Sequence, residues 1–259
     1  MQPLPIDLTE DGHMHTSLCG HATGTMEEYV QEAIKRGLKK IYFLEHLETG
    51  ISYFETTWLS DEDFDHYFRE GKRLQKKYAG AIEIGLGVEV GYNPDKVDVI
   101  LQKLSERQWD RIGISYHFLN STAGHLNMVS SKQINIDALG EYGIEQVITA
   151  YYQDLTDAVR KLPGDVLCHF DAALRYNPEF RTSEKHGPFI DALLDAVAEK
   201  KMAVEVNTSG YKIRNEPYPA PALLKKVIER NIPLVAGSDA HHPQEVGRYF
   251  DRLANLSVW

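Results

Sequence analysis

The chain has 259 residues, of which 42% are hydrophobic and 25% charged, and this length and composition suit a globular protein with a large buried core. Its formal net charge of −10 disfavours a nucleic-acid polymer as partner. No run approaches the roughly 18 apolar residues of a bilayer span, and the N-terminus lacks the features of a secretory signal. The two cysteines, Cys19 and Cys168, form no disulfide framework, so we expect a cytoplasmic protein.

Short apolar runs alternate with longer amphipathic segments along almost the whole chain. We predict strands at residues 11–15, 40–46, 82–91, 111–118, 165–171, 203–208 and 232–238. We predict helices at residues 25–37, 60–79, 94–105, 137–162, 188–200, 221–230 and 244–255. This alternation indicates parallel βαβ units.

Seven such units favour a closed, TIM-like α/β barrel in a single domain spanning residues 1–259. An open doubly wound sheet is the alternative. The first strand–helix turn, however, has no glycine-rich nucleotide-binding signature.

Potential metal ligands lie at or just after the ends of six predicted strands. They are His13, His15, His21, His46, Glu89, His117, His169, Asp239 and His241. The carboxyl ends of barrel strands meet on one face, so we expect these side chains to converge. Imidazoles and carboxylates together bind zinc, manganese or iron. The pattern therefore predicts a polynuclear metal site and a metallohydrolase.

Strand periodicity predicts which neighbouring side chains share that face, because residues i and i+2 point the same way. By this rule Asp11 accompanies His13, Asp171 accompanies His169, and Cys168 points away from the barrel interior. The remaining histidines and the other cysteine are expected to be bystanders, the histidines on the surface: His66, His125, His186, His242 and Cys19.

These motifs resemble the PHP (polymerase and histidinol phosphatase) superfamily, and within it the monofunctional histidinol-phosphate phosphatases. The resemblance extends from Asp11 to the segment 243–247. The segments that point to the phosphatase branch are 115–119, 169–175 and 205–210 followed by 216–219. The second motif departs from the family, since Leu44 stands where threonine is common.

The resemblance implies a distorted (β/α)7 barrel that holds three divalent ions, typically zinc, manganese or iron. It implies a first ion bound by His13, His15, Glu89 and Asp239. It implies a second bound by His21, His46 and His241, and a third shared by Glu89 with His117 and His169.

The resemblance also implies hydrolysis of a small phosphate monoester, with L-histidinol phosphate the best single candidate. Ion-activated water would attack phosphorus without a protein nucleophile, and Asp239 would help to orient it. Asp171 is the candidate proton donor to the leaving group, with Asp11 as an alternative that orients a ligand histidine.

Phosphate and substrate recognition needs cations and polar groups at the rim of the site. The candidates are Arg175, Lys212, Arg214 and Asn207. The insertion-like loop 120–132 is expected to shape the mouth of the pocket. No prediction of oligomeric state follows from the sequence.

Two other functions stay open. The same scaffold could hydrolyse another phosphomonoester, a nucleotide or a phosphodiester. The barrel could instead be a non-catalytic metal-binding or partner-binding domain, although its complete ligand set argues against that.

Overall fold

The computed structural model describes residues 6–122, 124–177, 180 and 184–258. Its centre is a seven-stranded parallel sheet in the order β1-β2-β3-β4-β7-β8-β9. Hydrogen bonds join the first strand to the segment after the last: the His15 N–H donates to the Ala240 carbonyl and the Asp239 N–H to the His13 carbonyl, both at 2.9 Å. The sheet is thus a nearly closed barrel, which confirms the predicted fold and excludes the open doubly wound alternative.

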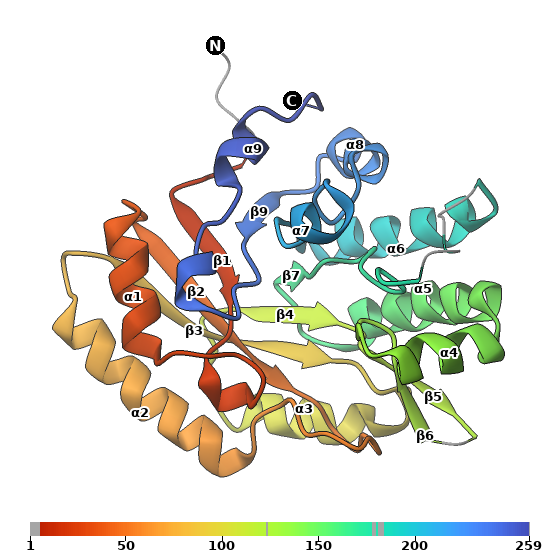
Figure 1. Cartoon of the computed structure of the whole chain (residues 1–259), viewed down its shortest axis with the longest axis horizontal. Helices are drawn as coiled ribbons and strands as arrows, with labels where there is room; N and C mark the ends of the chain where they lie inside the picture. Colours follow the sequence, from red (N-terminus) through yellow and green to blue (C-terminus); the bar gives the residue numbers. More distant parts are fainter. Residues whose placement is uncertain (1–5, 123, 178–179, 181–183, 259) are drawn as a thin grey trace.

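The barrel strands and the helices alternate, and the helices surround the sheet (Figure 1). The barrel strands are β1 (Glu10–Met14), β2 (Lys40–Leu47), β3 (Glu83–Gly91), β4 (Ile112–Ser115), β7 (Val166–Leu167), β8 (Ala203–Asn207) and β9 (Leu234–Gly237). The antiparallel hairpin consists of β5 (Phe118–Ser121) and β6 (Gly124–Asn127). The α-helices are α1 (Met26–Lys35), α2 (Asp61–Lys77), α3 (Val97–Ser105), α4 (Gln133–Tyr142), α5 (Ile144–Lys161), α6 (Gly187–Lys200), α7 (Gly210–Arg214), α8 (Pro221–Glu229) and α9 (Phe250–Ala254). The short 3₁₀ helices are η1 (Ser17–Cys19), η2 (Pro94–Lys96), η3 (Glu184–His186) and η4 (Pro243–Glu245).

The first two helices begin where their sequence signals predict. Thr25 and Ser60 each accept a hydrogen bond from the backbone three residues later, and the acidic side chain there reaches back to the cap. These reciprocal bonds satisfy N–H groups that have no partner within the helix.

Apolar side chains pack in two separate regions. The main core lies between the strands and the helices and includes Ile41 and Phe43 of β2. The alternate residues Tyr42 and Leu44 form a second, small cluster with Cys168 inside the barrel. The inside of the barrel thus holds few apolar residues, which leaves its carboxyl end to polar side chains.

Four predicted elements differ from the observed ones. The predicted strand 111–118 ends at Ser115, and the β5–β6 hairpin follows it. The predicted strand 165–171 is reduced to the two residues of β7. The predicted helix 137–162 is two helices, because Gly143 breaks it with a φ of 105°. The C-terminal helix is shortened to η4 and α9.

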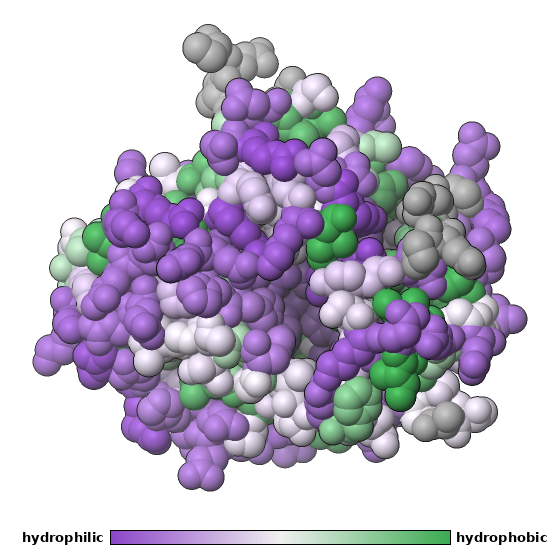
Figure 2. All heavy atoms as spheres, in the orientation of Figure 1, coloured by the Kyte–Doolittle hydropathy of each residue, from purple (hydrophilic) through white to green (hydrophobic). Residues whose placement is uncertain are grey.

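The face shown in Figure 2 is mainly hydrophilic, with scattered hydrophobic residues. No helix in the described part of the chain is long and apolar enough to cross a membrane. The cytoplasmic location stays a prediction.

Candidate metal centre

The nine predicted ligands all converge at the carboxyl end of the barrel. Seven of them line a cavity of 530 Å³: His21, His46, Glu89, His117, His169, Asp239 and His241. His13 and His15 lie beneath it, at most 1% exposed. The convergence expected from strand-end positions is therefore present.

Glu89 stands at the centre of this cluster, with its side chain fully buried. One or other of its oxygens lies within 3.6 Å of a ring nitrogen of five histidines: His13 (3.6 Å), His15 (3.6 Å), His46 (2.8 Å), His117 (3.3 Å) and His169 (2.8 Å). Such a carboxylate can bridge neighbouring cations, the role that the family resemblance implies for it.

The remaining ligands extend the cluster toward the segment after β9. The Nε2 atoms of His21 and His241 lie 2.9 Å apart. Nε2 of His15 lies 3.4 Å from Oδ1 of Asp239, and the His15 ring stacks on that of His46 with centroids 4.0 Å apart. The nine side chains therefore form one continuous group.

Two of the nine ligands have an unusual backbone conformation. His169 and Asp239 have φ values of 21° and 50°, in a region that non-glycine residues seldom adopt. Such conformations cost free energy and persist where surrounding contacts enforce them, often at functional sites.

Strand periodicity predicted the wrong direction for Asp11. Between Asp11 and Met14, β1 advances three residues while β2 advances two, so β1 contains a bulge. The Asp11 carboxylate accepts hydrogen bonds from the Ser238 N–H at 2.9 Å and the Gly247 N–H at 2.7 Å. It joins the first strand to the C-terminal segment and contacts no ligand imidazole.

The same rule failed for Cys168. Its sulfur lies inside the barrel, grouped with ligand atoms of His13 and Glu89 that all lie within 4.8 Å of one another. β7 ends at Leu167, and the unusual φ of His169 turns both consecutive side chains inward. Period-two alternation holds only while the chain stays extended.

Burial and neighbouring charges give the histidines contrasting pKa values. Burial lowers the pKa of His21 to about 3 and holds that of His15 well below its ordinary value. Burial also opposes the charged form of His13, but the carboxylates of Glu205 and Glu89 outweigh it and hold the pKa of His13 well above the ordinary value. Neutral imidazoles carry the free lone pair that a cation requires.

The donor set fits divalent cations. Two buried ring nitrogens in the cluster lack a hydrogen-bond partner among the described residues: Nδ1 of His15 and Nε2 of His46. Buried polar atoms without partners are costly, and a bound cation would satisfy such lone pairs. Three of the metal-capable groups consist entirely of predicted ligands.

The residues predicted to bind the substrate are divided between the metal cavity, an adjoining cavity and the surface. Arg175 lines the metal cavity and also an adjoining cavity of 660 Å³. Arg214 and Asp171 line the adjoining cavity alone, with Nη2 of Arg214 3.3 Å from Oδ2 of Asp171. The side chain of Lys212 is 68% exposed and pairs with Glu245.

Neither Lys212 nor Asn207 lines either cavity. The fully buried Asn207 accepts hydrogen bonds from the N–H and hydroxyl of Ser209. Asn207 thus holds the turn after β8, and the same Ser209 hydroxyl also lies 3.4 Å from Oδ2 of Asp239. A role of Asn207 in substrate binding stays a prediction.

Two carboxylates that we did not predict from the sequence contact ligand histidines. Oε1 of Glu48 lies 2.8 Å from Nδ1 of His117, and Oε1 of Glu205 lies 2.8 Å from Nδ1 of His13. Glu48 lies two residues beyond His46 and Glu205 inside a strand, so the rule of alternation could have placed both on the barrel interior.

The four remaining histidines only partly match the surface prediction. His66 and His242 are exposed, and His125 is half-buried. The prediction is wrong for His186, which is 1% exposed with Nε2 3.1 Å from Glu145. Cys19 is buried and belongs to none of the metal-capable groups.

The last part of the segment after β4 lines the mouth of the cavity. Residues 127 and 129–132 line it, opposite Tyr53 and Glu55. Lys132 forms an ion pair with Glu55, and Asn135 donates a hydrogen bond to the Tyr53 hydroxyl at 2.8 Å. These contacts join two segments that face each other across the rim.

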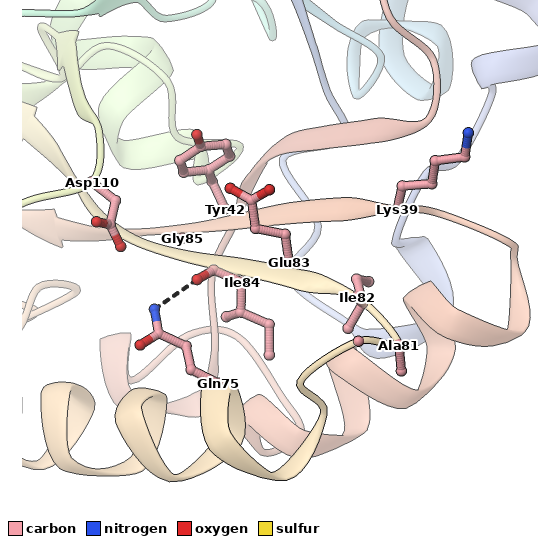
Figure 3. A pocket seen from close by; sticks show the side chains of 10 residues that line it. Lys39, Tyr42, Gln75, Ala81, Ile82, Glu83, Ile84, Gly85 and Asp110 are labelled. Atoms are coloured by element: carbon pink, nitrogen blue, oxygen red, sulfur yellow. Dashed lines mark hydrogen bonds between the residues drawn. The ribbon is translucent and has the colours of Figure 1, made fainter.

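A larger cavity of 740 Å³ lies at the opposite end of the barrel, where β2 and β3 begin (Figure 3). Tyr42, Glu83 and Asp110 line it, and Gln75 donates to the Ile84 carbonyl at 2.7 Å. None of the metal-capable groups among the described residues includes a residue of this cavity. Size alone therefore does not identify the functional site.

Comparisons with known proteins agree with this geometry. Residues 11–209 match the PHP domain family, and residues 226–254 match the PHP-associated family. The "Probable histidinol-phosphatase" of Deinococcus radiodurans is 32% identical over 249 residues, which cover 95% of this chain and 92% of that protein. The histidinol-phosphatase of Bacillus subtilis is 28% identical, covering 93% and 96% respectively.

Solved structures share the fold. A Listeria monocytogenes protein named provisionally as the histidinol phosphatase hisK superimposes with a TM-score of 0.86 at 25% identity, covering 94% of this chain and 99% of that one. The Lactococcus lactis histidinol phosphate phosphatase, complexed with zinc, L-histidinol and phosphate, gives a TM-score of 0.70 at 20% identity over 95% of this chain and 92% of that one. With a family model matching most of its length, this chain belongs to the PHP domain family.

Proposed function

We propose that the protein is a metal-dependent phosphoric monoester hydrolase that converts L-histidinol phosphate to L-histidinol and phosphate, a step of histidine biosynthesis. The observation that carries the proposal is the buried cluster of nine ligands around Glu89. The names of relatives that span almost the whole chain support the choice of substrate.

The cluster has donors for three divalent ions, with the ligands divided as the family resemblance implies. Zinc is the first candidate because a neighbour in structure binds it, and manganese and iron suit the same donors. Bound divalent ions lower the pKa of water and neutralise charge on the phosphoryl and leaving oxygens. No side chain needs to act as a covalent nucleophile.

The protein's own residues would hold and orient the substrate. Arg175 lines the metal cavity, where its guanidinium can contact two phosphate oxygens at once. Arg214 is 23% exposed in the adjoining cavity and is the second candidate for contacts with the substrate. Asp239, beside His15, would orient the attacking water as well as bind an ion.

Asp171 is the proposed proton donor to the leaving oxygen. It is 3% exposed, and burial raises the pKa of its carboxyl group despite the nearby Arg214. Its Oδ1 atom has no hydrogen-bond partner among the described residues. An Asp171→Asn variant that retains its metals and normal turnover would remove Asp171 from the mechanism.

A substrate panel tests the proposed function. We expect histidinol phosphate to give the highest kcat/KM, above nucleotides, other phosphomonoesters and bis-p-nitrophenyl phosphate, and we expect chelation to abolish turnover. A preference for a nucleotide or diester would favour another phosphoesterase of this family. Absence of turnover with metals bound would favour a non-catalytic domain.

A further inference from the structure

Glu205 is a buried carboxylate that the proposed chemistry does not use. It lies on β8, 1% exposed, and no lysine or arginine in the described part of the chain forms an ion pair with it. A buried carboxylate is costly unless hydrogen bonds compensate it. What those bonds hold should therefore indicate its role.

Each oxygen of Glu205 contacts a different ligand residue. Oε1 lies 2.8 Å from Nδ1 of His13, and Oε2 accepts a hydrogen bond from the backbone N–H of His169 at 2.9 Å. Metal binding requires a neutral His13 ring, and because an ionised carboxylate can only accept hydrogen bonds, the single proton of that neutral ring would reside on Nδ1. Nε2 then presents its lone pair, and it points at the cluster, 2.9 Å from Nε2 of His15.

The second contact holds an unusual backbone turn. His169 has a φ of 21°, and in this conformation its Nε2 reaches Oε1 of Glu89 at 2.8 Å. Oε2 of Glu205 holds the N–H of that same residue. The neighbouring strand leaves room for this carboxylate, because a Cβ atom on Gly237 would lie 2.0 Å from Oε1.

We propose that Glu205 is a positioning residue that fixes His13 in its metal-binding tautomer and locks the His169 turn, so that one side chain orients ligands of two different ions. The proposal rests on metal binding by His13 and His169 under the proposed function. Glu205 forms a metal-capable group with His13 and His169, but both its oxygens are engaged, and one of them contacts the nitrogen of His13 that faces away from His15. Its contacts therefore favour a positioning role over direct metal binding.

Glu48 provides a matched control. It is also buried, and its Oε1 contacts Nδ1 of His117 at 2.8 Å, but its Oε2 has no hydrogen-bond partner among the described residues. Glu48 therefore orients one ligand and Glu205 two. Removing each carboxylate should affect different numbers of ions.

The variants Glu205→Gln and Glu48→Gln keep the size of the side chain and remove its charge. A glutamine at 205 has one acceptor oxygen, so it can hold the His169 N–H or the Nδ1–H of His13 but not both. If its NH₂ group faces His13, the proton moves to Nε2 and blocks metal binding. Loss of such an orienting carboxylate typically weakens metal binding roughly 10–100-fold.

Zinc titration against a competing chelator, without substrate, is the test, with circular dichroism to verify folding. We expect roughly 10–100-fold weaker binding at two sites in Glu205→Ala, which loses both contacts, at one of those two sites in Glu205→Gln, and at one site in Glu48→Gln. Glu205→Asp retains the charge but is too short for both contacts, so it should stay impaired. Wild-type affinity in Glu205→Gln, or full recovery in Glu205→Asp, would overturn the positioning role.

A measurement on the unaltered protein guards against misfolded variants. In zinc-loaded protein with ¹⁵N-labelled histidine, NMR should find the His13 proton on Nδ1 and the metal on Nε2. The reverse assignment would overturn the proposal. Failure of the wild type to bind any metal would instead overturn the proposed function.

Discussion

At the amino end of the barrel, polar groups find partners within the protein, whereas at the carboxyl end several have none. Arg111 pairs with Glu10 at 2.7 Å, and its guanidinium lies 3.6 Å from the centroid of the Tyr42 ring. Lys40 pairs with Glu83 at 2.6 Å. Among the residues that the structure describes, the carboxyl end instead holds buried atoms without a hydrogen-bond partner, including Nδ1 of His15, Nε2 of His46 and Oε2 of Glu48.

The difference indicates that the amino end of the barrel contributes to stability, whereas the carboxyl end provides the functional site. Partnered groups at the amino end have little left to offer a ligand, although the larger cavity lies there (Figure 3). Unpartnered groups at the carboxyl end cost free energy unless a cation or substrate satisfies them. Barrel enzymes have their active sites at the carboxyl ends of the strands. Four substitutions can test whether stability and function are divided in this way between the two ends of this barrel.

The largest effect is expected from Glu89→Gln at the centre of the cluster. Loss of the shared carboxylate should reduce kcat on the order of 10³-fold, because ions supply several kcal/mol of charge stabilisation in the transition state. Bound zinc should fall in parallel. Glu83→Gln is the control, at the other end of the same strand and 67% exposed. Equal activity loss in both variants would refute the division.

Arg175→Ala should have the next largest effect. Loss of a charge-assisted hydrogen bond to phosphate costs about 1.5–3 kcal/mol, so kcat/KM should fall roughly 10–100-fold with zinc content unchanged. Lys212→Ala removes a cation that lies outside both cavities and should leave the kinetics unchanged. Unchanged kinetics in Arg175→Ala would remove that residue from phosphate recognition.

The sequence predicts the direction of a side chain only where the backbone is a regular extended strand. The ligands themselves could be predicted, because the ends of parallel strands must share a face whatever the details of packing. The directions of Asp11 and Cys168 could not, because a bulge in β1 and a left-handed turn at His169 interrupt the alternation. Gly12 lies within the bulge, and glycine inside a strand is typical of a bulge, but one glycine does not say which residues share a face after it. The turn at His169 has no glycine or proline beside it.

Contacts between distant segments were also beyond the sequence. Alternation could have placed Glu205 on the barrel interior, but it lies 192 residues from His13, and no local pattern indicates which interior residue it contacts. His186 likewise contacts Glu145, 41 residues away in the sequence, with Nε2 3.1 Å from Oε2. The barrel, by contrast, follows from a repeating local pattern, so its closure could be predicted.

Arg111→Met should change stability and leave activity intact. The substitution leaves Glu10, whose side chain is 19% exposed, without its ion pair and removes the cation from the Tyr42 ring. We expect the free energy of unfolding to fall by about 1–3 kcal/mol, measured by urea denaturation. Adding Glu10→Gln should recover part of that loss. A fall in kcat at unchanged zinc content would show that the two ends are coupled.

The smallest effect concerns acid pH and the rim of the metal cavity. Nδ1 of His125 accepts a hydrogen bond from the Ser52 N–H at 3.1 Å, so this ring must be neutral there. Burial lowers the pKa of His125, against the opposing charges of Glu48 and Asp95. The pKa of His125 in the folded protein therefore lies below the ordinary value of about 6.5. His125 binds a proton more readily when its hydrogen bond with Ser52 is broken than when it is formed.

The stability of this contact should therefore be complete above pH of about 6.5 and decrease as the pH falls below it. One hydrogen bond is worth about 1 kcal/mol, so the hydrogen-exchange protection factor of the Ser52 amide should decrease roughly fivefold. His125→Asn keeps an acceptor that does not titrate, and its protection should be independent of pH. The Arg111–Glu10 pair at the other end contains no histidine, so amides around it should keep their protection over the same range. Equal losses at both ends would mean that acid loosens the whole barrel rather than the rim of the metal site.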